Sequence, residues 1–346
     1  MTDSITFILP TRNRTDYVGR AIDSCLAVES SGLSVRVMVI DASSTSDCID
    51  MLRERYRQQP AVEVLAQPPD AKGFMGACFF AVGRLETRFA TFMYDDDVLS
   101  PYIASMYQRM VTEGCPFAMG FGQTNRADRV LPFRPITNWA HPGWWNLLLG
   151  WFGNTRWLYR AMPVSPVSCL VTSDLLRRWM VQVRDFAAMN GFRDYYVMRR
   201  NIGGDLMIYL LATIDAKQGP LLAEEIVAQW SEHPDSMTVL AEHLDLFAGY
   251  WLARCWAVGY CVDTGELQKA ARLAGYVVVS GLAAARDARR QGKSDLARSI
   301  ASEIRCVVAK VGLARVAVQV IVAATAIALG KIGRSQKRPL EPLTDR

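Results

Sequence analysis

In its first part the chain alternates short, unbroken apolar runs with stretches that have helical spacing. The apolar runs cover residues 5–10, 35–41, 62–67 and 89–94, and the helical stretches cover residues 16–28, 45–59 and 75–85. Apolar runs without polar alternation are typical of strands buried on both faces, and the helices between them connect such strands in parallel. The pattern therefore predicts an α/β fold with helices on both faces of a mostly parallel sheet. In such sheets ligands bind at the carboxyl ends of the strands.

The remainder of the chain divides into a mixed part and a helical part. Strand and helix patterns continue to about residue 238, so we predict one domain over residues 1–238. Three proline-free segments of helical character follow it, at residues 240–262, 266–290 and 294–330. We therefore predict an α-helical C-terminal region over residues 239–346. Its last segment would form a single rod of about 50 Å, at a rise of 1.5 Å per residue.

Charge and cysteine content favour a cytoplasmic protein that does not bind nucleic acid. The formal charge of +5 is too small to indicate a nucleic-acid partner. The eight cysteines form no CxxC pair and several have apolar neighbours, which favours reduced thiols in a reducing compartment. The start "MTDSITFILP" lacks a basic segment before its short apolar run, so it is not expected to act as a signal peptide.

Three adjacent aspartates follow the fourth apolar run, in the stretch "TFMYDDDVLSP". One interpretation is that Asp97 or Ser100 caps a following helix. Capping leaves the adjacent charges unexplained, whereas a bound Mg²⁺ or Mn²⁺ would remove their repulsion, because both ions prefer oxygen ligands. In extended backbone, Asp95 and Asp97 would share one face and bind the ion, with Asp96 pointing elsewhere. Since Mg²⁺ is usually held by carboxylates together with substrate phosphates, a phosphorylated ligand is implied.

Two further motifs accompany the aspartate triplet. The first predicted strand leads into "PTRNR", and the second contains and leads into "VIDASS". In this order and spacing, the three motifs resemble those of the family 2 glycosyltransferases, which have a Pro-Thr/Ser-x-Asn-Arg signature, a Val-Asp-Asp-Gly-Ser segment and an Asp-x-Asp motif. The resemblance covers roughly residues 4–238. It implies a GT-A fold, a Rossmann-like domain that binds a nucleotide-sugar.

The resemblance also implies roles for individual residues. Thr11 and Asp41 would contact the nucleoside, and Asp97 would bind the metal that bridges the diphosphate. Asp95 would lie near both the ribose and the metal. Arg14 would lie nearby or be solvated, and Lys72 would lie on a nucleotide-contacting loop or be a surface lysine. The expected nucleotide-sugar contacts are therefore Pro10, Thr11, Asn13, Arg14, Asp41, Lys72, Asp95 and Asp96.

The sequence departs from the family pattern at two positions. Ala42 stands where the second Asp of the usual pair is expected, and "ACFFAV" after Gly76 replaces an Ala-Arg-Asn signature. Both departures affect how the nucleotide base and the donor sugar would be recognised. The metal-binding aspartates are intact.

Two later residues complete the predicted site. Asp205, in "NIGGDLMIYLLAT", opens an apolar helical stretch; it is a helix N-cap, or the general base that accepts the proton of the acceptor hydroxyl, or both. Its distance from the triplet resembles that of the family's Glu/Asp-Asp position. His233, in "WSEHPDSMT", is a structural histidine or, as the Trp-x-x-His-x-x-Ser pattern of some members implies, the third metal ligand. A mixed Asp/His site would suit Mn²⁺.

Two apolar segments are candidates for binding an acceptor, a membrane or a second copy of the chain. Residues 131–160 contain five tryptophans, which either pack under a long loop or stack on the sugars of an acceptor. Residues 316–330 carry no charge and have a basic flank. This segment is shorter than the roughly 20 residues that cross a bilayer, so we expect peripheral attachment to the inner face of the membrane, or self-association as a homo-oligomer.

Together these features predict an inverting, metal-dependent glycosyltransferase. The donor would be a nucleoside-diphosphate sugar, with UDP-sugar favoured from family frequency and Asp41. The acceptor would be a hydroxyl of a glycan or lipid-linked glycan, in the synthesis of bacterial cell-surface polysaccharide. Two alternatives are a catalytically idle, membrane-associated assembly subunit and a sugar-phosphate nucleotidyltransferase. The latter usually has a Gly-rich loop after its first strand, and here no glycine precedes Gly19.

Overall fold

The computed structural model describes residues 4–28, 33–125, 130–152, 165–216, 219–231 and 241–335. The chain folds into two compact units. The first consists of Met1–Leu147 and Pro163–Ala253, and the second of Leu148–Met162 and Arg254–Arg346. Helix α10 (His243–Asp263) contributes to both, because the division between the units lies within it.

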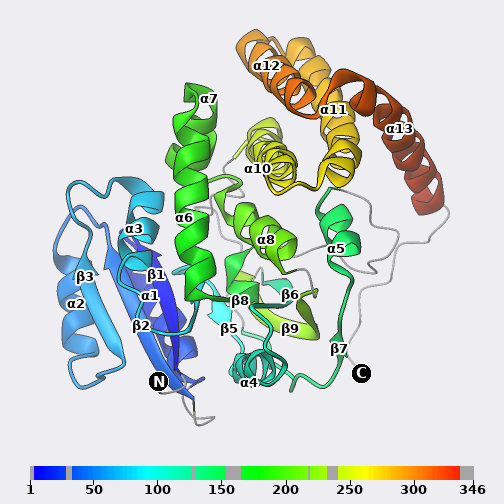
Figure 1. Cartoon of the computed structure of the whole chain (residues 1–346). Coiled ribbons are helices and arrows are strands. Elements are labelled where there is room, and N and C mark those ends of the chain that lie inside the picture. Colours follow the sequence, from blue (N-terminus) through cyan, green and yellow to red (C-terminus); the bar gives the residue numbers. More distant parts are fainter. Residues whose placement is uncertain are drawn as a thin grey trace. The chain divides into compact units, whose positions relative to one another are not determined.

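The first unit is built on a mixed sheet. Within the described residues its strands are β1 (Ser4–Thr11), β2 (Ser34–Asp41), β3 (Val62–Ala66), β4 (Phe89–Phe92), β5 (Val98–Leu99), β6 (Phe117–Asn125), β7 (Trp139–Ala140), β8 (Cys169–Thr172) and β9 (Leu221–Ser231). They follow the order β3-β2-β1-β4-β8-β6-β9-β5, with β7 paired to β9 (Figure 1). β1 to β4 form a parallel group, and β6 is parallel to β9, whereas β8 runs antiparallel between β4 and β6. The predicted fold class is confirmed.

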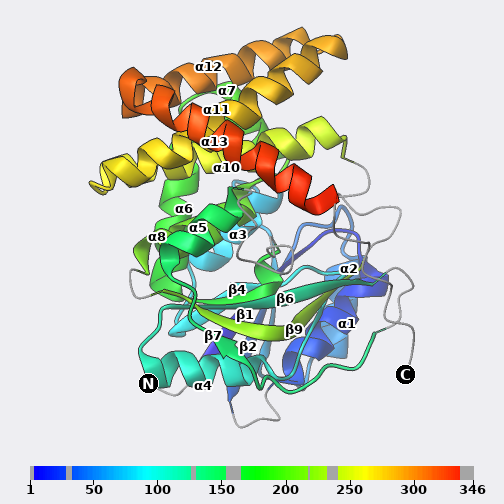
Figure 2. The same cartoon turned by 90° about the vertical axis from the view of Figure 1, so that its right-hand side faces the viewer.

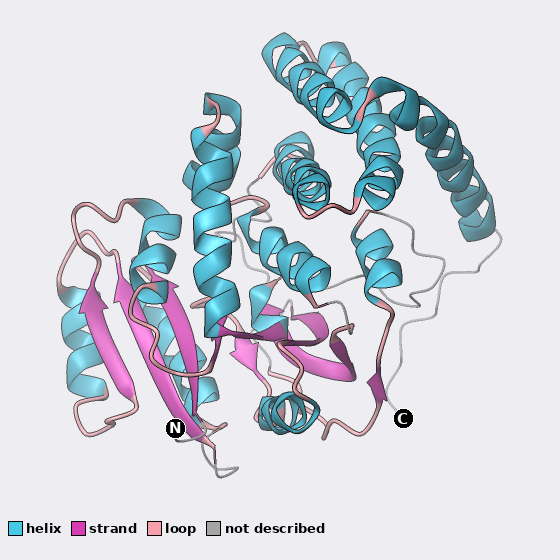
Figure 3. Ribbon diagram, viewed as in Figure 1, coloured by secondary structure: helices cyan, strands magenta, loops and turns pink. Residues whose placement is uncertain are grey.

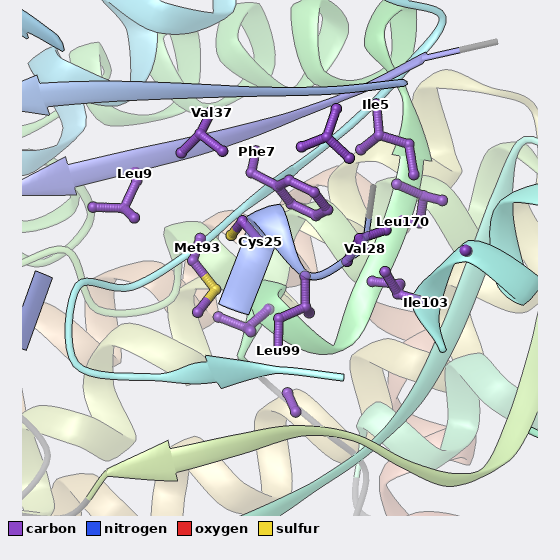
Figure 4. Packing of buried hydrophobic residues seen from close by; sticks show 14 of the residues in the cluster. Ile5, Phe7, Leu9, Cys25, Val28, Val37, Met93, Leu99, Ile103 and Leu170 are labelled. Carbon is purple, nitrogen blue, oxygen red and sulfur yellow. The ribbon is translucent and has the colours of Figure 1, made fainter. Parts of the chain in front are cut away.

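Helices cover both faces of the sheet (Figure 3). The helices described up to residue 215 are α1 (Thr15–Leu26), α2 (Asp47–Arg55), α3 (Gly73–Val82), α4 (Ile103–Glu113), α5 (Trp144–Trp151), α6 (Ser173–Ala188), α7 (Gly191–Arg193) and α8 (Gly204–Asp215), together with η3 (Pro166–Ser168) and η4 (Asp194–Arg199). On one face, alternate residues of β1 and β2 pack against α1, because successive strand residues point to opposite faces. This core includes Ile5, Phe7, Leu9, Cys25 and Val37, all fully buried (Figure 4).

The opposite face is covered by α3 and α6. Helix α3 packs against β1 and β2. The ring of Trp179, on α6, lies 5.7 Å from Phe79 of α3 and 5.1 Å from Phe92 of β4, measured between ring centroids. Helix α3 is apolar on nearly all sides because it lies between the sheet and α6. The sheet is thus buried on both faces, as its unbroken apolar runs predict.

The second unit is helical, as predicted. Helix α11 (Leu267–Arg290) packs against both α12 (Ser294–Val311) and α13 (Leu313–Ser335) (Figure 2). Gly275 allows this packing, because an added Cβ would lie 2.4 Å from the backbone oxygen of Gln319 on α13. No single helix in the described part of the chain combines the length and hydropathy needed to cross a bilayer; α12 and α13 meet that criterion only as a bent pair.

The expectation of a single rod over residues 294–330 is wrong. The two helices meet at Gly312 with a bend of 117°. Gly312 has a φ of +99°, a backbone conformation that residues with a Cβ rarely adopt. A glycine inside an apolar helical pattern is compatible with a continuous helix, so the sequence pattern did not reveal the break.

Candidate active site

The carboxyl ends of β1, β2 and β4 meet at one edge of the sheet. β1 and β2 end at the paired residues Thr11 and Asp41, which are buried. Asp95 follows β4, and the Thr11 hydroxyl donates a hydrogen bond to its Oδ2 atom at 2.8 Å. The parallel register therefore brings together side chains that are far apart in the sequence. Pro10 lies in β1 opposite Ile40 and is also buried.

Hydrogen bonds join the loops after β1 and β2. The Asn13 N–H donates to Ser43 Oγ at 2.8 Å, and the Ser44 N–H donates to Asn13 Oδ1 at 3.1 Å. Ser43 Oγ in turn donates to Asp41 Oδ1 at 2.5 Å. Asn13 has a φ of +55°, a conformation that asparagine adopts more readily than most residues. Asn13 and Ser43 thus fix the orientation of the Asp41 carboxylate.

The backbone of the aspartate triplet is a turn, not the extended strand that we expected. The Asp97 N–H donates to the Tyr94 carbonyl at 3.3 Å. The Asp96 carboxylate lies 3.5 Å from Arg14 Nη1, and its backbone carbonyl accepts a hydrogen bond from Arg20 at 3.0 Å. Asp96 therefore points toward α1 and its preceding loop. The turn results from this local hydrogen bonding, which the apolar pattern of β4 does not encode.

Burial and mutual repulsion make Asp95 and Asp97 costly to ionise. The pKa of Asp95 is raised to about 6, first by burial and then by the negative charge of Asp96, against the hydrogen bond from Thr11. Burial, followed by the charges of Asp96 and Asp95, raises the pKa of Asp97 well above its ordinary value. A cation would compensate both the burial and the repulsion, so this pair of carboxylates fits a divalent ion.

Arg20 and Ser231 link the triplet to the end of β9. Arg20 Nη2 donates to Ser231 Oγ at 2.9 Å, and the Ser231 N–H donates to Asp97 Oδ1 at 3.1 Å. Ser231 precedes His233 by two residues, and His233 lies outside the described residues. Among the residues that the structure describes, no three His, Cys, Asp or Glu side chains are grouped so that they could hold a metal ion.

Lys72 lies at the start of α3 and is exposed. Gly76 lets the preceding loop lie against the helix, because an added Cβ would be 2.4 Å from the Ala71 carbonyl. The Gln67 side chain holds the same loop by donating to the carbonyl of Gly73 at 2.7 Å. In the described part of the chain, Lys72 makes no hydrogen bond or ion pair with the other predicted site residues.

Asp205 lies in the first turn of α8. Its Oδ1 atom accepts a hydrogen bond from the Leu206 N–H at 2.8 Å. Burial raises the pKa of Asp205 to about 7, against backbone hydrogen bonds and a hydrogen bond from Tyr250. The carboxyl group is thus held by the helix N-terminus and titrates close to neutral pH.

A close approach between two glycines brings α10 to the start of α8. An added Cβ on Gly203 would lie 2.2 Å from the Gly249 carbonyl oxygen, and one on Gly249 would lie 2.3 Å from Ile202 Cγ2. This contact places the Tyr250 hydroxyl 3.4 Å from Asp205 Oδ2. Gly203 also has a φ of +93°, so both its conformation and its surroundings require glycine.

Gly203→Ala is therefore expected to lower the free energy of unfolding by about 2–4 kcal/mol, from the left-handed conformation and the overlap with Gly249 together. Urea denaturation measures this loss. Gly114→Ala is the matched control, since Gly114 has a φ of +65° with no atom within 4 Å of an added Cβ. It should cost about 1 kcal/mol. Equal losses in the two variants would mean that the contact between Gly203 and Gly249 is not tight.

Tyr94 connects the triplet with Asp205. Burial raises the pKa of the Tyr94 phenol well above its ordinary value, and the negative charges of Asp205 and Asp97 both add to the effect. Asp205 and Asp97 thus both affect the titration of this side chain, which directly precedes the triplet in the sequence. The ring of Phe74, from α3, lies 5.8 Å from that of Tyr94 and covers this region.

The tryptophans of residues 131–160 differ in how far they are buried. Trp151 is buried, which fits packing, whereas Trp144 and Trp145 are half-buried, with ring centroids 6.0 Å apart. Arg109 lies over the ring of Trp139, 4.9 Å from its centroid. Trp157 lies outside the described residues.

Sequence reasoning missed four residues at this site. They are Arg20, Ser43, Tyr94 and Tyr250. Ser43 lies within the "VIDASS" motif and Tyr94 directly precedes the aspartate triplet, so their position could have suggested them. Arg20 and Tyr250 act from α1 and α10, and only the packing of these helices reveals their contacts.

Comparison with known proteins gives the family of the domain and similar folds. Residues 6–174 match the family described as glycosyl transferase family 2. No curated protein matches the chain. Among solved structures, S. aureus TarS 1–349 in complex with UDP-GlcNAc has a TM-score of 0.54 at 14% identity, over 88% of this chain and 92% of that one. A second S. aureus TarS structure has a TM-score of 0.51 at 14% identity, over 80% of this chain, which spans 43% of that one.

At 14% identity, the similarity to the TarS structures shows the fold alone. The family match, in contrast, covers the strands that carry Thr11, Asp41 and the aspartate triplet. Residues 6–174 therefore form a glycosyl transferase family 2 domain, in a first unit with a GT-A-like fold that is followed by a helical C-terminal region.

Proposed function

We propose that the enzyme transfers a sugar from a nucleoside-diphosphate sugar, with UDP-sugar favoured, to a hydroxyl of a glycan or lipid-linked acceptor. The observation that carries this proposal is the edge of the sheet where Thr11, Asp41 and the aspartate triplet meet within the family 2 domain. The UDP-GlcNAc complex of TarS 1–349, a protein of similar fold, supports a UDP-sugar donor. The half-buried rings of Trp144 and Trp145 suit a glycan acceptor, and the family resemblance favours a role in bacterial cell-surface polysaccharide synthesis.

We propose that Asp95 and Asp97 hold Mn²⁺ or Mg²⁺. Their raised pKa values support this, because an ion would favour their charged forms. When bound, such an ion would neutralise charge that develops on the departing diphosphate. His233 is the proposed third ligand. This assignment is supported by Ser231, which lies two residues earlier in the sequence and donates its N–H to Asp97.

Asp205 is the proposed general base. As the acceptor oxygen forms its bond to the anomeric carbon, the carboxylate takes the hydroxyl proton. The bond between that carbon and the diphosphate breaks, and its electron pair leaves with the nucleoside diphosphate. Attack from the face opposite the leaving group inverts the anomeric centre without a covalent enzyme intermediate. A pKa of about 7 suits this role, because the carboxylate form is available near neutral pH.

Isothermal calorimetry with UDP, GDP and dTDP, each with and without Mn²⁺, tests the donor and metal assignments. We expect Mn²⁺-dependent binding of UDP. Binding of GDP or dTDP alone would change the donor class. If none of the three binds, and no hydrolysis or transfer of UDP-sugars occurs, the proposal fails and the catalytically idle alternative becomes the better one.

Tyr250→Phe is expected to move the acid limb of the pH–rate profile to higher pH by about half a pH unit. The Tyr250 hydroxyl stabilises the charged form of Asp205, so its removal raises the pKa of the base. The shift is small because 3.4 Å is long for this type of hydrogen bond. Transfer rates measured across pH 5–9 would show it. Tyr195→Phe is the control, since Tyr195 is exposed and its hydroxyl contacts Arg200. An unchanged Tyr250→Phe profile would exclude this coupling.

A further inference from the structure

The side of α13 that faces away from α11 exposes large apolar side chains. On the inward side, Val316 and Ala323 are buried. On the outward side the exposed fractions are 73% for Leu313, 60% for Val318, 70% for Ile321 and 46% for Val322. Single exposed apolar residues are common, whereas a contiguous group marks an interaction surface.

These residues form two adjacent rows along α13. Positions four residues apart lie one above the other on a helix. One row is Leu313, Ala317 and Ile321, and the other is Ala314, Val318 and Val322. All six are exposed, and none carries a charge or a hydrogen-bonding group. We call these six residues the α13 apolar face.

The net charge of the helical region indicates which kind of partner the α13 apolar face binds. From Arg254 to Arg346 the sequence has 16 Lys and Arg residues against seven Asp and Glu, whereas residues 1–253 have 23 against 27. Basic residues flank the α13 apolar face in the sequence, with Arg315 near its start and Lys331 and Arg334 beyond its end. Two copies of such a region would repel each other, but an anionic lipid surface would attract it.

The length and bend of the helices favour binding in the plane of a membrane. No single helix of the described residues could cross a bilayer, and the 117° bend at Gly312 turns α13 away from α12. A helix with a wide apolar side and basic residues at its borders is typical of interfacial attachment. The exposed apolar rows would enter the acyl-chain boundary while the basic residues contact the headgroups.

We propose that the α13 apolar face docks the helical unit on an anionic phospholipid bilayer, with α13 lying in the membrane plane. The attachment does not require the sugar-transfer reaction, so it stands independently of the proposed function. It would place the enzyme at a surface where lipid-linked acceptors are found.

Vesicle flotation tests the proposal. The full chain is mixed with vesicles of phosphatidylglycerol and phosphatidylcholine, or of phosphatidylcholine alone, at low and high salt. We expect the wild type to float with the anionic vesicles and to bind less at high salt. The Val318→Glu/Ile321→Glu double variant should lower the bound fraction by about tenfold or more, since it puts two charges into the apolar face. Ile321→Ser should have a smaller effect in the same direction.

Val181→Glu is the matched control, because Val181 is an exposed apolar residue on a helix of the first unit. It adds a negative charge without touching α13, so its flotation should equal that of the wild type. Circular dichroism checks that each variant is folded. The proposal is overturned if the wild type does not float, or if the double variant floats as well as the control. It is also overturned if sedimentation shows a dimer that Val318→Glu/Ile321→Glu dissociates, since the face would then bind a second copy.

Discussion

Asp205→Asn is expected to lower kcat for sugar transfer by about 10²–10⁴-fold, the range by which a positioned general base accelerates a reaction. Asparagine keeps the side-chain oxygen that accepts a hydrogen bond from the Leu206 N–H, so the start of α8 should be unchanged. Calorimetry with UDP should give the same affinity as for the wild type, because Asp205 acts on the acceptor. A variant that binds UDP normally and transfers sugar at more than a tenth of the wild-type rate would exclude Asp205 as the base.

The pH dependence of the wild type offers an independent measurement of the same assignment. The base is active as a carboxylate, so the transfer rate should rise with pH and level off above the Asp205 pKa of about 7. This acid limb should be absent from the residual activity of Asp205→Asn. If both proteins have the same limb, the titrating group is another residue.

The same carboxyl group is expected to make the stability of the fold depend on pH. Its pKa is raised from 3.8 to about 7 in the folded protein. Because the folded state holds the proton more tightly than the unfolded state, this group favours folding at low pH, and that contribution is lost as pH rises toward 7. At pH 8 Asp205→Asn should therefore unfold at a higher urea concentration than the wild type. Lost activity with raised stability would separate a catalytic role from a folding defect.

The parallel core and the order of the site motifs could be predicted from sequence because both depend on local pattern. Unbroken apolar runs indicated β1, β2 and β4, and parallel strands carry their carboxyl ends to one edge. That rule put the ends of these strands at one edge, and the family resemblance singled out Thr11, Asp41 and Asp95 there. The extended backbone expected for the triplet was wrong, since the turn depends on the hydrogen bond from the Asp97 N–H to the Tyr94 carbonyl.

Contacts between elements that are distant in the sequence could not be predicted from the apolar pattern. Tyr250 reaches Asp205 only because Gly203 and Gly249 allow two helices to touch through their backbones. A glycine in a sequence signals conformational freedom but does not name the segment that will approach it. Gly312 shows the same limit, since its φ of +99° ends α12 inside a stretch whose composition favours a continuous helix.

Asp97→Asn is expected to remove Mn²⁺-dependent UDP binding, with a loss of affinity of about 100-fold or more in the presence of the metal. Asparagine can still accept the hydrogen bond from the Ser231 N–H, so the fold at the end of β9 is kept. It lacks the charge that a hard cation requires. Calorimetry with UDP, with and without Mn²⁺, measures the effect. Affinity without metal should be nearly unchanged.

Asp96→Asn distinguishes the loss of a metal ligand from the loss of one negative charge in the triplet. It removes the same charge from the adjacent position, but Asp96 points toward Arg14. Any effect on UDP affinity should therefore be similar with and without Mn²⁺. If the two variants lose Mn²⁺-dependent binding equally, the triplet acts through its summed charge, and Asp97 is not a ligand. If only Asp97→Asn loses it, the Asp97 carboxylate itself, and not the summed charge of the triplet, is required to hold the ion.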